Sequence, residues 1–424
     1  MTSPASYQAG PWDLSQSSYS SVTTSSGGTL SLSTFSKPAS TYDGDPIASS
    51  FLYPSSHVTV SLGRRVWNLR QPVYGFNGIV HGFVQLSREC THVVRVEVSL
   101  LGRVKVTSSD RGLISEHVNR KLVTSEVVLS CPPQDGFTPT EESFSFSIPF
   151  PSHVTDGTSP LPPSCTLLSS AFSTEVEYCV RVNVHRKGLR RHELRIIPVL
   201  YLPKTWPSHP VPRREAIFGS ILSSTHYKTV SLQPVWPHEG PAKAMATVPT
   251  VELFYPSNVT YPSGQSIHLR LTIHSKEAPA LALLLAQGLE AHLVKCIIAR
   301  THGGHVGGRE VVISKGNVTQ IDTTEEGFAI LYFDLTLGES GKEQSWTVDD
   351  DIKMTYLIRV SVSCPDSTIN FLPTYKHASR IGVATEPAPR EHGLLGFGGF
   401  SDPAIEMRDE RLEERGVSHV NAGW

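Results

Sequence analysis

The sequence lacks a long hydrophobic run, a strong charge of either sign and a dense set of cysteines. Its longest apolar run, Ala278 to Leu289, is far too short to cross the roughly 30 Å hydrocarbon layer of a bilayer as a helix. The 37 Lys and Arg nearly balance the 39 Asp and Glu, so no overall field points to nucleic acid as a partner. The six cysteines are scattered over 424 residues without a Cys-x-x-Cys pair, which indicates buried thiols in a reducing compartment.

The short motifs that indicate an enzyme are also missing. There is no Gly-x-Ser-x-Gly, P-loop, dinucleotide-binding glycine pattern or His-Glu-x-x-His. Cys165 and Cys179 lie outside any Cys/His signature, and His302 and His305 have no further ligand nearby. The run 349–351 of three Asp is more typical of a solvated turn than of a calcium loop. We therefore expect no catalytic residue, no metal, no cofactor and no enzyme activity.

Alternation of apolar and polar residues dominates what is present. Val94, Val96 and Val98 are predicted to share one face of a strand, with Arg95 and Glu97 on the other, which is the period of a half-buried strand. Similar runs separated by Gly and Pro predict an all-β protein of two antiparallel, immunoglobulin-like β-sandwiches. The segment Pro279–Gly288 is ambiguous between a short helix and a buried strand. The predicted strands are Val58–Leu62, Gly78–Leu86, Val93–Val106, Lys121–Leu129, Glu142–Ile148, Glu175–His185, Glu193–Tyr201, Val251–Phe254, Ser266–Ile273, His292–Ala299, Glu310–Ser314, Gly327–Leu335, Lys353–Val362 and a last one near 378–385.

Three stretches around these strands are poor in aliphatic residues. Residues 1–55 are rich in Ser and Thr and are predicted to be disordered, because they cannot bury enough apolar surface to offset the entropy of ordering. Residues 206–248 carry repeated prolines and are predicted to be a linker with a short helix near 213–222. The tail 389–424 is predicted to be flexible. The two blocks are then 56–205 and 249–388.

Several stretches in fixed order resemble the arrestin-like proteins, particularly the fungal α-arrestin type. The first block carries LPPSC (161–165) and EVEYCVRVNVHRKGLRRHELRIIPVLYLP (175–203); the second opens with VELFYPSNVTYPSGQSIHLRLTI and closes with IKMTYLIRVSVSCPDSTINFLPTY. The resemblance covers roughly 56–386 and implies an N-terminal and a C-terminal arrestin lobe. It also implies a non-enzymatic cytoplasmic adaptor at the plasma membrane or endosomes. Such adaptors link membrane cargo, transporters or receptors, to a HECT-type ubiquitin ligase and endocytosis.

Members of that family often carry Pro-Pro-x-Tyr motifs, whose polyproline II segments dock on the WW domains of the ligase. This sequence has none, since its pairs at 132–133 and 162–163 are followed by Gln-Asp and Ser-Cys. The nearest variant is Leu372-Pro373-Thr374-Tyr375, a candidate degenerate WW ligand whose Leu372, Pro373 and Tyr375 would make the contacts. The alternative is a buried strand-to-turn corner. The missing motif leaves open a ligase-independent sorting or signalling scaffold at the plasma membrane or endosome.

One basic cluster stands out. Arg186, Lys187, Arg190 and Arg191 crowd a predicted hairpin tip, with Gly188 supplying the turn conformation. Such a tip is a candidate anion- and phosphate-binding site for phosphorylated cargo tails or anionic lipid head groups. The alternative is a solubilising tip that blunts a sheet edge.

Overall fold

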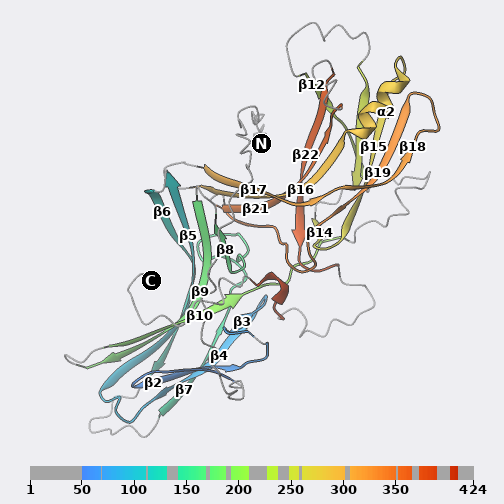
Figure 1. Cartoon of the computed structure of the whole chain (residues 1–424). Coiled ribbons are helices and arrows are strands. Elements are labelled where there is room, and N and C mark those ends of the chain that lie inside the picture. The colour runs from blue at the N-terminus through green and yellow to red at the C-terminus, as the bar shows by residue number, and fades with distance from the viewer. Residues whose placement is uncertain are drawn as a thin grey trace, which may run out of the picture. The chain divides into compact units, whose positions relative to one another are not determined.

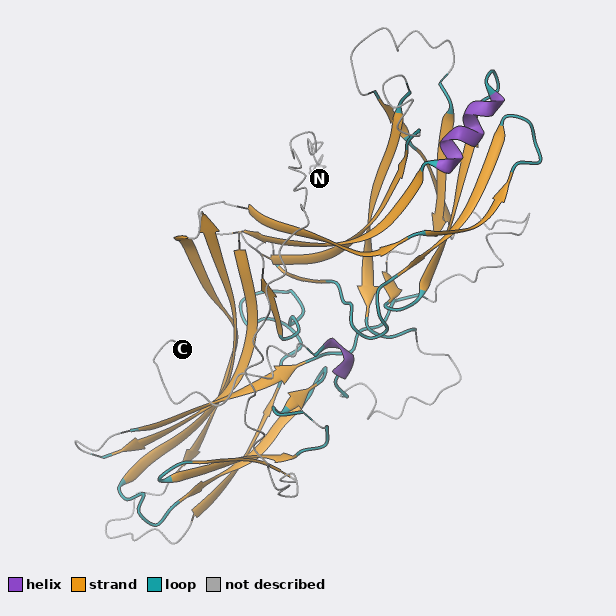
Figure 2. Cartoon of the chain, in the orientation of Figure 1, coloured by secondary structure: helices purple, strands orange, loops and turns teal. Residues whose placement is uncertain are grey.

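The computed structural model describes residues 50–67, 69–110, 113–130, 142–168, 172–187, 192–209, 227–236, 248–256, 260–300, 306–349, 352–364, 372–388 and 402–408. Strands are the dominant element among these residues, with loops between them (Figure 2). They all belong to one compact unit, 48–424. The all-β prediction is therefore confirmed.

The first sandwich consists of two sheets between residues 50 and 205 (Figure 1). One sheet has the strand order β1-β2-β4-β7 and the other has the order β3-β10-β9-β5-β6, with β8 paired to β9. All pairings are antiparallel except that between β3 and β10. The strands are β1 (Ser50–Pro54), β2 (Val58–Arg64), β3 (Val73–Tyr74), β4 (Ile79–Leu86), β5 (Val93–Asp110), β6 (Leu113–Ser130), β7 (Glu142–Pro149), β8 (Cys165–Leu168), β9 (Phe172–Arg186) and β10 (Glu193–Tyr201).

The second sandwich occupies residues 227–388 and contains a five-stranded sheet, β11-β13-β15-β19-β18, and a seven-stranded one. The seven-stranded sheet has the order β12-β22-β21-β16-β17, with β14 parallel to β22 and β20 antiparallel to β21. The strands are β11 (Tyr227–Ser231), β12 (Gln233–Val235), β13 (Thr250–Pro256), β14 (Thr260–Pro262), β15 (Ser266–His274), β16 (Leu289–Arg300), β17 (Val306–Lys315), β18 (Asn317–Asp322), β19 (Phe328–Thr336), β20 (Trp346–Val348), β21 (Ile352–Val362) and β22 (Thr374–Ala384).

The ambiguous segment is the helix α2 (Pro279–Gln287), which begins with a proline in its first turn and packs Ala282, Leu285 and Ala286 into the core. Proline is favoured there because the first helical N–H groups have no partner within the helix. No helix among the described residues is long and apolar enough to cross a membrane.

Several details differ from the sequence prediction, and the strands β3, β8, β14, β18 and β20 were not predicted. β1 lies inside the segment predicted to be disordered, and β11 and β12 lie inside the predicted linker, where they pair with β13 and β22. Val94 is 56% exposed although Val96 and Val98 are buried, because the pairing with β9 shifts between Val93 and Arg95. Such an irregularity changes the face on which the preceding side chain lies. The predicted disorder of residues 1–49 and the helix near 213–222 fall outside the described residues.

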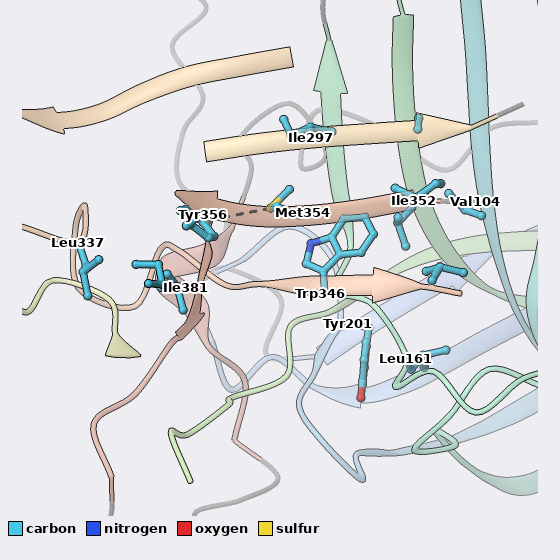
Figure 3. Close-up of a cluster of buried hydrophobic side chains, with 14 of the residues drawn as sticks. Val104, Leu161, Tyr201, Ile297, Leu337, Trp346, Ile352, Met354, Tyr356 and Ile381 are labelled. Atoms are coloured by element: carbon cyan, nitrogen blue, oxygen red, sulfur yellow. Dashed lines mark hydrogen bonds between the residues drawn. The ribbon is translucent and has the colours of Figure 1, made fainter. Parts of the chain in front are cut away.

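Buried side chains continue from one sandwich to the other. Figure 3 shows Trp346, Ile352 and Met354 of the second sandwich in one hydrophobic cluster with Leu161 and Tyr201 of the first. Next to it, Phe150, Tyr178 and Tyr201 make aromatic contacts, and the hydroxyl of Tyr178 donates a 2.6 Å hydrogen bond to the carbonyl of Pro162. Hydrogen bonds between Thr205 and Thr385, which follow β10 and β22, join the ends of the two sandwiches.

Candidate functional site

The outer side of the β5–β9 sheet carries a band of charged side chains, which we call the charged face. On β9, valines and Tyr178 fill the core from every second position, so the positions between them point outward. On β5 the same alternation leaves Arg95, Glu97, Arg103 and Lys105 on the outside. The register pairs Arg95 with His185, Glu97 with Asn183, Arg103 with Glu177 and Lys105 with Glu175.

A compact ion-pair network lies near the middle of this face. Arg103 Nη2 lies 3.0 Å from Glu177 Oε2, and Lys105 Nζ lies 2.8 Å from the same oxygen and 3.5 Å from Glu175 Oε2. The four side chains are only 11–24% exposed. Burial alone would raise the pKa of Glu177, but the hydrogen bond from Lys105 and the positive charges of Lys105 and Arg103 outweigh it and lower that pKa. Glu177 is therefore ionised at neutral pH and balances its cations.

A second network lies nearer the β9–β10 hairpin. Arg95 Nε lies 2.7 Å from Glu97 Oε1, and His185 Nε2 lies 3.2 Å from Glu97 Oε2. Arg95 also reaches Glu126 on β6 at 3.1 Å, where both side chains are well exposed. Burial opposes ionisation of Glu97, but the hydrogen bond to His185 and the charge of Arg95 prevail and lower its pKa.

The predicted anion-binding cluster adjoins this network, and the structure describes two of its members. Arg186 is half-buried and its Nη2 lies 3.0 Å from Cys90 Sγ, while Lys187 is exposed and its backbone N–H donates to the carbonyl of His92. Arg190 and Arg191 lie outside the described residues. Among the described residues of the tip, Lys187 is therefore an exposed cation, and Arg186 is half-buried against Cys90.

Cys179 does not have the character of a nucleophile, whereas Cys165 at the start of β8 is half-buried. Cys179 lies on the charged face between Glu177 and Arg181 but is only 1% exposed, and burial raises its pKa to about 12. A thiol with this pKa is protonated at neutral pH, and the thiolate is the reactive form. Among the described residues, no group of three or more His, Cys, Asp and Glu could hold a metal ion. His302 and His305 are not described.

The candidate WW ligand lies at the start of β22. Tyr375 is 1% exposed, and its hydroxyl donates a 2.7 Å hydrogen bond to the carbonyl of Pro249. Pro373 is buried and Leu372 packs against the core. A WW domain could bind this tyrosine only if β22 first detached from its sheet. The folded chain therefore does not present a free peptide ligand here. The segment is instead the buried strand-to-turn corner that the sequence left as the alternative.

Sequence reasoning missed a polar contact between the two sandwiches. Asp349, predicted to lie in a solvated turn, pairs with Arg120 of β6 and accepts a 2.8 Å hydrogen bond from the hydroxyl of Ser159. These contacts hold its pKa below the usual value, the Ser159 hydrogen bond contributing most. No local pattern could have revealed them, because Ser159 and Asp349 are 190 residues apart in the chain.

A scan of protein families finds no family model that matches this chain, and no curated protein matches it.

Proposed function

We propose that this protein is a non-enzymatic adaptor of the α-arrestin type, which links membrane protein cargo to a HECT-type ubiquitin ligase and endocytosis. The quoted stretches of both blocks support this proposal through their order and their resemblance to the two lobes of arrestin-like proteins. The observation that favours a binding role most is the charged face, a band of paired and largely buried charged side chains along β5 and β9. Fold alone does not define function, so the proposed binding role depends on the charged face.

The charged face suits an extended, charged segment of a partner. Arg103, Lys105, Glu175 and Glu177 are held by their neighbours in fixed positions, so little side-chain entropy is lost when a ligand contacts them. A phosphate or carboxylate of a partner's tail replaces one of the internal carboxylates as the partner of Arg103 or Lys105. Lys187 and Arg186, at the hairpin end, add electrostatic attraction for the same tail. Cargo tails and anionic lipid head groups share this chemistry.

The binding role of the hairpin tip is tested with the variant in which Arg186, Lys187, Arg190 and Arg191 are all replaced by Ser. We expect weaker binding to phosphopeptides and to anionic liposomes at low salt, with the melting temperature little changed. Binding by the unchanged chain should weaken as salt rises, because the Debye length is only about 8 Å at physiological ionic strength. A matched control replaces the exposed Lys228 and Lys276 of the second sandwich by Ser. Equal binding by both variants would leave the tip as a solubilising device.

A second candidate function is a ligase-independent sorting or signalling scaffold at the plasma membrane or endosome. It is favoured by the missing Pro-Pro-x-Tyr motif together with the burial of Tyr375. Proximity labelling of the full chain in its native cell, followed by pull-down on isolated WW domains, separates the two functions. Recovery of a ligase together with membrane proteins supports the adaptor, and membrane proteins without a ligase support the scaffold. Recovery of neither would contradict both.

A further inference from the structure

A loop of the first sandwich holds a serine against the second sandwich. The loop between β7 and β8 contains Ser159 followed by Pro160, and it is fixed to β6 because Thr155 donates two hydrogen bonds, 2.8 and 3.1 Å long, to the carbonyl of Leu122. Thr158 and Pro160 are exposed, and Ser159 is half-buried. The sequence has three Ser-Pro or Thr-Pro dipeptides, and the other two, at 3–4 and 138–139, lie outside the described residues.

The hydroxyl of Ser159 makes both of its contacts with Asp349. It donates to Asp349 Oδ1 at 2.8 Å and accepts the backbone N–H of Asp349 at 2.9 Å. Asp349 has a φ of 43°, a left-handed conformation that is uncommon for a residue other than glycine. Arg120 pairs with the other carboxylate oxygen, Oδ2. Ser159, Asp349 and Arg120 therefore form a clasp between the two sandwiches.

There is little room around this clasp. A Cβ atom placed on Gly157 would lie 3.1 and 3.2 Å from the two carboxylate oxygens of Asp349, so the loop backbone packs directly against the carboxylate. A larger anionic group on Ser159 would have to displace Asp349.

We propose that Ser159 is a phosphorylation site for a proline-directed serine/threonine kinase and that phosphorylation opens the clasp. The Ser159 oxygen attacks the γ-phosphorus of ATP, the bond from that phosphorus to the bridging oxygen of ADP breaks, and the hydroxyl proton passes to the base of the kinase. The phosphoserine no longer donates to Asp349 and brings about 1.5 to 2 negative charges beside its carboxylate. Arg120 then pairs with the phosphate, because a guanidinium binds phosphate in a bidentate manner.

The test treats the full chain with a recombinant proline-directed kinase and ATP, maps the phosphate by peptide mass spectrometry, and measures hydrogen exchange. We expect phosphate on Ser159 and about tenfold faster exchange at the amide of Asp349, since the hydrogen bond from that amide to the Ser159 oxygen is lost when the clasp opens. Phosphatase treatment should restore slow exchange. Ser159→Ala should not be phosphorylated at this position, and Ser152→Ala, whose hydroxyl contacts His153 on the same loop at 2.8 Å, should behave as the unchanged chain.

Two results would overturn the proposal. In the first, the kinase modifies a peptide spanning 152–165 but leaves Ser159 of the folded chain unmodified, which would show that the clasp keeps the serine from the enzyme. In the second, Ser159 is phosphorylated and exchange around Asp349 stays as slow as before, which would show that the clasp tolerates the phosphate. Arg120→Ala supplies an independent measure of the open clasp, because it removes the partner of Asp349 without touching the loop.

Discussion

Replacing Glu177 by Gln tests the ion-pair network of the charged face. Removing one partner of a buried ion pair costs roughly 3–5 kcal/mol. The side chains here are 11–24% exposed and Gln keeps some hydrogen bonds, so we expect the variant to lose about 2 kcal/mol of unfolding free energy. That loss corresponds to about 30-fold faster hydrogen exchange in β5 and β9. The matched control is Glu126→Gln, whose pair with Arg95 is well exposed and should contribute about 0.5 kcal/mol or less.

The effect of Glu177→Gln should also depend on pH. Because the folded state lowers the pKa of Glu177, its ionised form contributes stability above the unfolded pKa, and that stability is lost as pH falls through the folded pKa. The difference in unfolding free energy between the variant and the unchanged chain should therefore have its full size at pH 7 and become smaller below about pH 4.5. Equal exchange rates at pH 7, or a difference that is the same at pH 7 and at pH 4, would refute the reasoning. The same variant should bind phosphopeptides more tightly, since Arg103 and Lys105 lose a competing carboxylate.

Three further predictions concern stability and reactivity. Tyr178→Phe removes the 2.6 Å hydrogen bond to Pro162 and should cost about 1–2 kcal/mol in urea unfolding; no change in the midpoint would contradict this. Gly82→Ala would place Cβ 2.3 Å from the carbonyl oxygen of Ser61, so a lower melting temperature is expected, whereas Gly308→Ala meets no atom closer than 3.8 Å and should be neutral. The Cys179 thiol, with its pKa raised to about 12, should resist a thiol reagent at pH 8 until the chain is unfolded, and labelling of the folded chain at this residue would show that its burial is wrong.

The sequence by itself determined most strands and which residues fill the core. In β21, buried and half-buried side chains alternate without a break from Ile352 to Val362, as the pattern over Lys353–Val362 predicts. The same holds for β15, from Ser266 to His274. These predictions succeed because alternation is a local property, since each side chain of a strand lies on the opposite side from its neighbour. Arg95 and Glu97 lie on the face opposite Val96 and Val98, as the same alternation predicts.

Only the tertiary structure decided what those outward residues contact. β11 and β12 have weak patterns of their own and form because the edges of two sheets offer hydrogen-bond partners to them. The side on which Val94 lies depends on an irregularity in its pairing with β9, which no single strand encodes. The clasp of Asp349 joins residues 190 and 229 positions apart. Such contacts depend on where whole sandwiches place their loops, and local sequence patterns carry no information about that.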